Sequence, residues 1–401
     1  MNTLILQFRK VTPLCLIVCA LGCLAPPVQA VVPPPDGGYP NFTTAEGDHA
    51  LQALTTGVGN TAIGTFSLFG VTTGNFNTAV GAASLDLNQA DSNTATGAAA
   101  LLFNTTGTEN TANGTAALEF NGIGSHNTGV GAFALFSNTT GQFHTAVGFG
   151  ALQNCIAPPD FAGNTAIGSR ALRSDTTGNF NTAIGDAALT SNLTGVVNTA
   201  IGLDALAFNT IGNENTATGG NALFTNTEGN QNTANGTFVL FSNTTGDLNT
   251  GVGRNALVAN DIGNSNTAVG AGALQNNTTG SGNVALGSDA GVAVSTASNV
   301  IVIGMSETGA DVSNTCFIGN ITGVAVEGVP VVVATNGQLG VAPAGSPLSA
   351  NELLKQQRVV QELKTRIALQ EGQIKALTAG VQKVSAQLEA SKPAPQVVNN
   401  P

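Results

Sequence analysis

Charge is the scarcest property of this chain of 401 residues. Only 9% of the residues are charged, whereas soluble domains usually carry about a quarter. Residues 31–341 contain nineteen acidic side chains but only three basic ones, Arg170, Arg173 and Arg254. A body with so few cations cannot neutralise a phosphate backbone. We therefore expect neither nucleic acid nor an anionic membrane surface as a partner.

Tryptophan is absent, tyrosine occurs once, and cysteine occurs five times. Cys15, Cys19 and Cys23 lie near the N-terminus, which leaves Cys155 and Cys316 far apart in the rest of the chain. Two cysteines and three scattered histidines form neither a disulfide framework nor the ligand cluster of a zinc site. The acidic residues are dispersed singly. The sequence predicts no catalytic, cofactor-binding or metal-binding residue, and we expect no enzyme.

Long apolar runs are also missing, since no stretch approaches the twenty residues that a membrane-spanning helix needs. The longest, residues 11–24, follows Arg9 and Lys10 and precedes a small-residue cleavage site that ends at Ala30. This order is typical of an export signal and predicts an extracellular or cell-surface protein. An alternative interpretation is a lipoprotein signal, with anchoring at Cys23.

An internal repeat of about seventeen residues makes up most of the sequence. Pentapeptides of the Asn-Thr-Ala-Ile-Gly type open fourteen repeat units, here called rungs, from Asn60 to Asn283. Eleven of the thirteen intervals are seventeen residues long and one is sixteen. The twenty-residue interval after His144 contains Pro158 and Pro159, which we interpret as a loop bulging from a turn. Such repetition predicts stacked copies of one supersecondary unit, an all-β solenoid.

Each rung, numbered from its opening Asn as position 1, has the same internal pattern. Position 5 is Gly in all fourteen rungs, position 8 is small, and position 9 is Leu until Gly291 ends the series. The alternation predicts two short strands per rung, at positions 1–5 and 6–9. Leu stacked on Leu, and Ile or Val of position 4 on its counterpart, would form a continuous core. We expect Asn and Thr ladders on the flanks, with the Thr of position 2 in a file along one face. The predicted core file is Leu68, Leu85, Leu101, Leu118, Leu135, Leu152, Leu172, Leu189, Leu206, Leu223, Leu240, Leu257 and Leu274.

Rungs such as Asn181-Thr182-Ala183-Ile184-Gly185-Asp186-Ala187-Ala188-Leu189 resemble the head repeats of trimeric autotransporter adhesins. The resemblance covers residues 60–304. It implies a left-handed parallel β-roll, three chains packed side by side, and adhesion to a matrix or another surface. The rungs here are longer than the family's common ones, which implies longer turns. The family's membrane β-barrel is not expected after the C-terminal helix.

Residues 313–340 carry a second resemblance. They are similar to the segment that precedes the endosialidase-type intramolecular chaperone of tail fibres and some bacterial surface proteins. That chaperone cleaves itself with a Ser-Lys pair. Here a linker rich in Pro, Ala and Gly leads directly into a predicted helix, so we expect neither the chaperone domain nor its protease activity.

A helix is predicted from Ser349, which forms a capping-box pattern with Glu352. Two seven-residue series of mostly apolar residues follow, which is typical of a coiled coil. β-Branched residues in one series and Leu in the other favour dimers, whereas the adhesin resemblance implies trimers. We expect a homotrimer, because the head has far more surface to bury. The predicted coiled-coil core is Leu353, Val360, Leu363, Ile367, Ile374, Leu377, Val381, Val384 and Leu388.

These observations predict a secreted or cell-surface adhesin-like structural protein that binds a surface or matrix receptor of unknown identity. The alternatives are an ice-binding solenoid, suggested by the Thr file, and a purely structural fibre or tail-fibre-like spacer. The rung model also predicts that Leu206→Asp disrupts the core, whereas Asn209→Asp, in an outward turn, is nearly silent. The expected organisation is a signal peptide (1–30), an N-terminal linker and cap (31–59), head repeats (60–304), a β-rich neck and linker (305–348), a coiled coil (349–391) and a disordered tail (392–401).

Overall fold

A computed structural model describes residues 40–156, 163–319, 331–333, 339–341 and 350–391. The predicted signal peptide with its alternative anchor Cys23, the predicted loop at Pro158 and Pro159, and the predicted tail lie outside the described residues. The chain divides into two compact units, residues 1–321 and 322–401. Each unit is described by itself.

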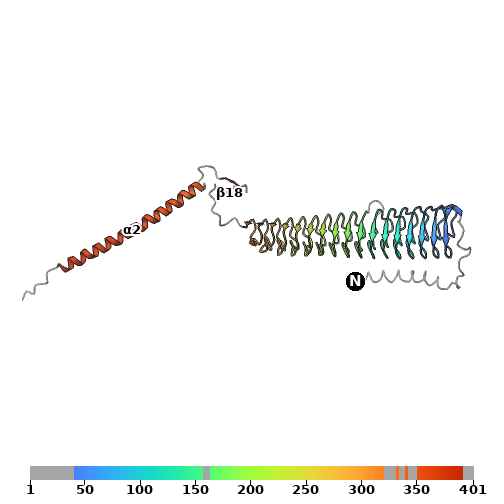
Figure 1. The fold of residues 1–401 in the computed structure, drawn as a ribbon, viewed down its shortest axis with the longest axis horizontal. Helices are drawn as coiled ribbons and strands as arrows, with labels where there is room; N and C mark the ends of the chain where they lie inside the picture. Colours follow the sequence, from blue (N-terminus) through green and yellow to red (C-terminus); the bar gives the residue numbers. More distant parts are fainter. Residues whose placement is uncertain (1–39, 157–162, 320–330, 334–338, 342–349, 392–401) are drawn as a thin grey trace, which may run out of the picture. The chain divides into compact units, whose positions relative to one another are not determined.

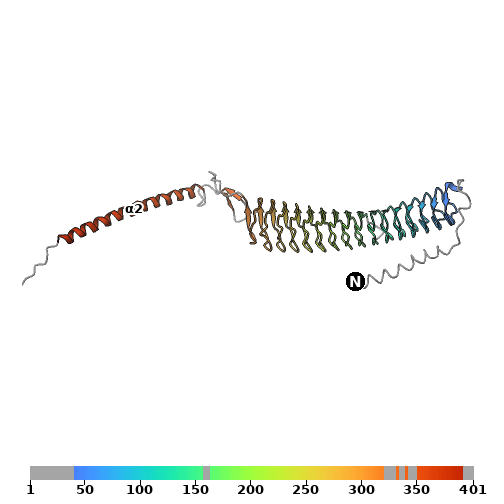
Figure 2. The same cartoon turned by 60° about the horizontal axis from the view of Figure 1, so that its bottom comes forward.

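The first unit is a parallel β-solenoid, which confirms the predicted fold class (Figures 1 and 2). One short strand comes from each rung and pairs in parallel with the strand of the next rung. At about 4.8 Å per strand, the sheet extends for roughly 75 Å. A short 3-10 helix, η1 (Pro40–Phe42), precedes the sheet. The strands are β1 (Thr44–Glu46), β2 (Thr61–Ile63), β3 (Thr78–Val80), β4 (Thr94–Thr96), β5 (Thr111–Asn113), β6 (Thr128–Val130), β7 (Thr145–Val147), β8 (Thr165–Ile167), β9 (Thr182–Ile184), β10 (Thr199–Ile201), β11 (Thr216–Thr218), β12 (Thr233–Asn235), β13 (Thr250–Val252), β14 (Thr267–Val269), β15 (Val284–Leu286), β16 (Ile301–Ile303) and β17 (Cys316–Ile318).

The sheet extends beyond the fourteen predicted rungs at both ends. β1 lies in the segment expected to be a linker and cap, and it pairs with β2 in the same register as later strands. β16 pairs with β15, and β17 in turn pairs with β16. The opening Asn is missing from these outer rungs, so their sequence pattern is weak. The backbone ladder does not need that side chain, because Thr44 still donates its N–H to the carbonyl of Asn60 at 2.8 Å.

The predicted second strand of each rung is wrong. Positions 6–11 form turns, as in residues 65–70. The Ser67 N–H bonds to the Gly64 carbonyl at 3.2 Å, and Phe66 and Leu68 have φ angles of 58° and 48°. Alternating left-handed residues cannot continue an extended strand. Rungs still bond to each other here, since Leu68 donates its N–H to the Ser84 carbonyl at 3.0 Å.

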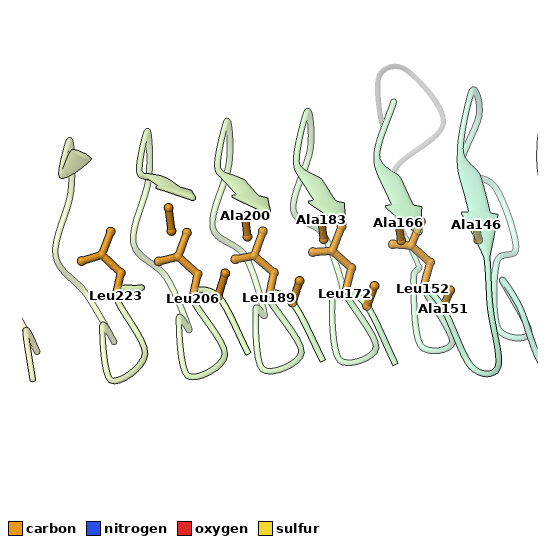
Figure 3. Packing of buried hydrophobic residues seen from close by; sticks show 14 of the residues in the cluster. Ala146, Ala151, Leu152, Ala166, Leu172, Ala183, Leu189, Ala200, Leu206 and Leu223 are labelled. Carbon is orange, nitrogen blue, oxygen red and sulfur yellow. The ribbon is translucent and has the colours of Figure 1, made fainter. Parts of the chain in front are cut away.

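The Leu file forms the core, as predicted, together with Ala of positions 3 and 8 (Figure 3). Every predicted Leu from Leu68 to Leu274 is fully buried. The Leu residues hold φ near +50°, a conformation that costs about 1–2 kcal/mol per residue. Burying a Leu side chain contributes about 1.5–3 kcal/mol, which offsets this strain. The file therefore combines the largest fully buried side chains with a series of strained residues.

Core volume is balanced between neighbouring rungs. Val239 occupies position 8, which is Ala or Ser in the other predicted rungs. The facing position 3 of the next rung is Gly251, where an added Cβ would lie 2.4 Å from a Val239 methyl group. The larger side chain thus fills the space that the missing Cβ leaves. Such pairing preserves the packing density of a thin core.

The Ile and Val residues of position 4 stack in register but do not join this core. Ile63 pairs with Val80, as predicted, yet its side chain is 42% exposed. Adjacent strand residues point to opposite faces, so the buried Ala of position 3 directs positions 2 and 4 outward. The prediction that Ile and Val help form the interior is therefore wrong.

The last full turn of the solenoid is closed by a carboxylate. Asp311 accepts hydrogen bonds from the backbone N–H groups of Ser295, Thr296 and Ala297 at 2.7–2.9 Å. In earlier rungs, N–H groups of this turn bond to the next rung's backbone, as Thr244 does to Asp261. These hydrogen bonds lower the pKa of Asp311 to about 2. Asp311 belongs to the next rung, and its side chain thus takes the place of that rung's backbone carbonyl.

The second unit contains the antiparallel pair β18 (Val331–Val333) and β19 (Leu339–Val341), followed by helix α2 (Ala350–Ala390). The helix has 41 residues and, at 1.5 Å per residue, is about 60 Å long. It confirms the helix predicted from the capping box. Within the described residues, no helix has the length and apolar character required to cross a membrane.

Candidate functional site

The outward side of the sheet, here called the strand face, consists of the side chains at positions 2 and 4. Its register is constant, with Thr182 opposite Thr199 and Ile184 opposite Ile201. The predicted Thr file is confirmed: it continues from β2 to β14 and ends where Val284 takes the position. Neighbouring side chains therefore repeat at the strand spacing of about 4.8 Å.

From β2 to β17 the strand face is uncharged and partly apolar, whereas β1 carries Glu46 at position 4. Among the described strands β2 to β17, none has a charged residue at position 2 or 4. In these rungs the acidic residues lie at other positions, for example Asp186 at position 6 and Asp204 at position 7. Position 4 is Thr or Asn in four rungs, and these divide its aliphatic residues into groups. An exposed apolar surface of this length is typical of an interaction site. The aliphatic residues of position 4 are Ile63, Val80, Val130, Val147, Ile167, Ile184, Ile201, Val252, Val269, Leu286, Ile303 and Ile318.

The asparagine ladders lie inside the solenoid, whereas the sequence placed them on its flanks. At position 1, Asn198 donates its backbone N–H to the Asn181 Oδ1 at 2.9 Å and its Nδ2 to the Gly212 carbonyl at 2.8 Å. Both asparagines are fully buried. A buried amide needs such partners, and here each one bonds two successive rungs together.

Position 12 forms a second buried ladder, which the sequence interpretation missed. Asn209 donates its Nδ2 to the Asn192 Oδ1 at 2.8 Å, and Asn226 donates to Asn209 in the same way. Asn209 is fully buried, so the prediction of an outward turn and a silent Asn209→Asp is wrong. The signal was available in the recurrence of Asn at position 12, followed three residues later by Gly. An outward turn does not require one constant side chain.

Both ladders change residue type at the same place, which we call the ladder break: His144 at position 1, and Cys155 and Asp175 at position 12. All three side chains are fully buried. The His144 Nε2 lies 3.6 Å from the Cys155 Sγ, and the Asn164 N–H donates to the His144 Nδ1 at 3.3 Å. A ring nitrogen that accepts this bond carries no proton, so neutral His144 has its proton on Nε2, toward the sulfur.

Burial shifts the pKa values of both ionisable groups. Asp175 accepts hydrogen bonds from Asn192 at 2.7 Å and Asn164 at 3.1 Å. Desolvation nevertheless raises its pKa to about 7, against the lowering effect of its bonds to Asn192 and Gly178. Desolvation lowers the pKa of His144 to about 4. In both cases the neutral form is favoured.

Asp175→Asn is expected to change the pH dependence of stability. Because its folded pKa is raised, the stabilising contribution of Asp175 is complete below pH 3.8 and is lost as the pH rises to about 7. The variant does not titrate here, so its stability relative to the natural protein should increase by on the order of 3 kcal/mol over this range. Urea unfolding across the pH series measures the difference, and Glu119, which also titrates, is present in both proteins. A difference independent of pH would contradict the prediction.

His144→Asn is expected to act in the opposite direction. Its folded pKa is lowered, so the contribution of neutral His144 is complete above pH 6.5 and is lost as the pH falls to about 4. The variant should therefore gain stability relative to the natural protein as the pH falls, in the same urea experiment. In the natural protein the effects of Asp175 and His144 on the pH dependence of stability largely cancel between about pH 4 and 6.5. In this range the folded state holds one proton on Asp175 and the unfolded state holds one on His144, so both states bind the same number of protons. A variant that loses stability on acidification faster than the natural protein would rule out this assignment.

Helix α2 carries a second apolar surface. Of the predicted coiled-coil residues, Leu353 has a side chain outside the described ones, and the other eight are 50–69% exposed. Apolar side chains repeated every seven residues along one stripe fit a partner helix. We call this set the heptad stripe.

Metal binding and cysteine chemistry have little support in the described part of the chain. Among those residues, no three His, Cys, Asp or Glu side chains gather closely enough to hold a metal ion. Cys316 is exposed at position 2 of β17, far along the chain from the buried Cys155. Comparisons with family models, with curated proteins and with solved structures found no match.

Proposed function

We propose that this protein is a secreted or cell-surface adhesin-like structural protein, in which copies of the chain associate through the strand face and the heptad stripe. The strand face, uncharged from β2 to β17, is the observation that carries the proposal. The solenoid is strongly acidic, so two copies repel each other on most approaches. Contact through positions 2 and 4 keeps the acidic residues apart and covers the exposed aliphatic file.

Two arguments support a parallel homotrimer. A parallel coiled coil formed by the heptad stripe brings the solenoids of its chains to the same end, where their strand faces can meet. The resemblance of the rungs to adhesin heads implies three chains. Export is supported by the apolar residues 11–24 after Arg9 and Lys10, and by the cleavage site at Ala30.

Leu377→Asp is expected to abolish or greatly weaken the association. Leu377 belongs to the heptad stripe, and a carboxylate there would be buried without a partner between helices. Leu369→Asp is the matched control, because Leu369 is equally exposed in the single chain but lies off the stripe. Sedimentation should give a trimer for the natural chain and for the control, and dissociation for Leu377→Asp. A natural chain that sediments as a monomer would refute the proposal.

Adhesion itself requires a ligand. Binding of the assembled protein to arrays of matrix proteins and glycans tests this part. Saturable binding to one class supports an adhesin. An assembled trimer without any such binding favours the alternative of a purely structural fibre or spacer.

Ice binding remains the second candidate, because the Thr file is now seen to lie on a regular, outward strand face. Hydroxyl and methyl groups repeated at one spacing can order water, whereas an interface between chains would cover them. The two functions therefore compete for the same surface. Thermal hysteresis of the purified chain decides between them: activity no greater than that of an ordinary soluble protein ends the ice-binding hypothesis.

A further inference from the structure

The ladder break interrupts two hydrogen-bonded columns between the same two rungs. In the regular part of the solenoid, the backbone N–H of position 1 donates to the Asn Oδ1 of position 1 in the preceding rung, as Asn181 does to Asn164 at 2.8 Å. At the break the equivalent contact, from the Asn164 N–H to the His144 Nδ1, is 3.3 Å long. Hydrogen bonds weaken as they lengthen beyond about 3.2 Å.

The side-chain contacts of position 12 change as well. The regular contact is an amide to an amide oxygen at 2.8 Å, as in Asn209 to Asn192. Across the break this column runs from Cys155 to Asp175, and neither side chain carries an amide, so the regular bond cannot form there. The His144 Nε2, 3.6 Å from the Cys155 Sγ, belongs to the same rung as Cys155. A thiol is a weak hydrogen-bonding group, so the two rungs lose the amide-to-amide contact that links the regular rungs at position 12.

The break also concentrates buried ionisable groups. Asp175 is aligned with Cys155 in the rung before it and with Asn192 in the rung after it, and it bonds to Asn164 of its own rung. The two cations of that rung are directed elsewhere. Arg170 contacts Asp186 of the following rung at 3.3 Å, and Arg173 donates to Gln153 across the break at 2.9 Å, away from Asp175. No cation among these contacts compensates the carboxylate when it ionises.

We propose that the solenoid opens locally between the rung of His144 and the rung of Asn164, while the rungs on either side remain folded. Each rung of a solenoid contacts only its neighbours, so the weakest junction determines where the stack separates. Opening there parts the Leu file between Leu152 and Leu172 and leaves two shorter solenoids. The inference goes beyond the proposed function and does not depend on the number of associated chains.

Hydrogen exchange of the full chain at neutral pH, resolved by peptide, tests the proposal. The amides of Thr145 and Leu152 bond across the break at 2.9 and 3.0 Å. The reference amides of Thr199 and Leu206 bond across a regular junction at 2.8 and 2.9 Å. Because the backbone hydrogen bonds at the two junctions have nearly equal lengths, similar protection from exchange is expected if the break does not open. Local opening should instead make the amides at the break exchange at least about tenfold faster. Equal protection at both junctions would overturn the proposal.

A restoring variant checks the cause. His144→Asn, Cys155→Asn and Asp175→Asn together introduce the regular residue at each position of the break. Exchange of the Thr145 amide should then slow to the rate of the regular junction. Unchanged fast exchange would show that the ladder residues do not cause the opening.

The reverse variant provides a matched control in a regular part of the stack. Asn198→His, Asn209→Cys and Asn226→Asp transfer the three residues of the break to the same positions of later rungs. A second fast-exchanging junction should appear there, with the original one still present. Protection that remains uniform across the new junction would contradict the proposal. The profile of the natural chain decides the matter even if a triple variant does not fold.

Discussion

Leu206→Asp is expected to split the solenoid near the rung that begins at Asn198. Leu206 is fully buried between Leu189 and Leu223 in the core file (Figure 3). The substitution removes a large apolar side chain, at about 2–5 kcal/mol, and places a carboxylate in an apolar interior at several kcal/mol more. That total cost exceeds the stabilisation that one rung contributes. Because rungs contact only their neighbours, the damage should remain local.

Limited proteolysis measures this effect, with new cleavage near Leu206 and two resistant fragments as the expected result. Leu203→Asp is the matched control, since it makes the same substitution three residues earlier at a side chain that is 53% exposed. The control should be as resistant as the natural protein. Equal resistance of both variants would mean that the Leu file is not the core. Asn209→Asp is unsuitable as a control, because Asn209 lies in a buried ladder.

Gly219→Ala is expected to destabilise the solenoid by on the order of 3 kcal/mol or more, through strain and a backbone clash. Gly219 has a φ angle of +132°, which residues with a Cβ rarely adopt. An added Cβ would lie 2.6 Å from both the carbonyl carbon and the oxygen of Gly236 in the next rung. Neither atom can move away without widening the strand spacing, which the hydrogen bonds of the sheet hold constant.

The adjacent residue offers a close comparison. At Gly220 the nearest atom to an added Cβ is the Leu203 carbonyl oxygen, 4.0 Å away. Gly220→Ala should therefore leave stability nearly unchanged. Urea unfolding followed by circular dichroism measures both variants, and similar midpoints for the two would show that position 5 does not limit the approach of the rungs.

The repeat made much of the solenoid predictable. A constant interval places the same residue of each rung at the same point of the stack, so Leu206 had to lie beside Leu189 and Leu223. The Thr file follows from the same argument. Gly at position 5 in every predicted rung indicated a close approach of backbones, which the contact of Gly219 with Gly236 now explains.

The heptads of α2 were readable for a similar reason. A seven-residue period on a helix of 3.6 residues per turn produces one stripe, whatever surrounds the helix. The identity and number of partner chains are a different matter, since they depend on surfaces that a single sequence period does not describe. The homotrimer therefore stays a prediction until the association is measured.

By itself, the sequence determined the repeat length, the in-register stacking, the buried Leu file and the C-terminal helix, because each of these depends on periodicity alone. Only the tertiary structure decided which polar residues are inside. Asn198 and Asn209 are buried because neighbouring rungs satisfy both ends of their amides. His144, Cys155 and Asp175 are adjacent only because the coil brings positions 1 and 12 together. The repeat period shows which residues stack on one another, but the path of the chain within each rung decides whether their side chains point inward or outward.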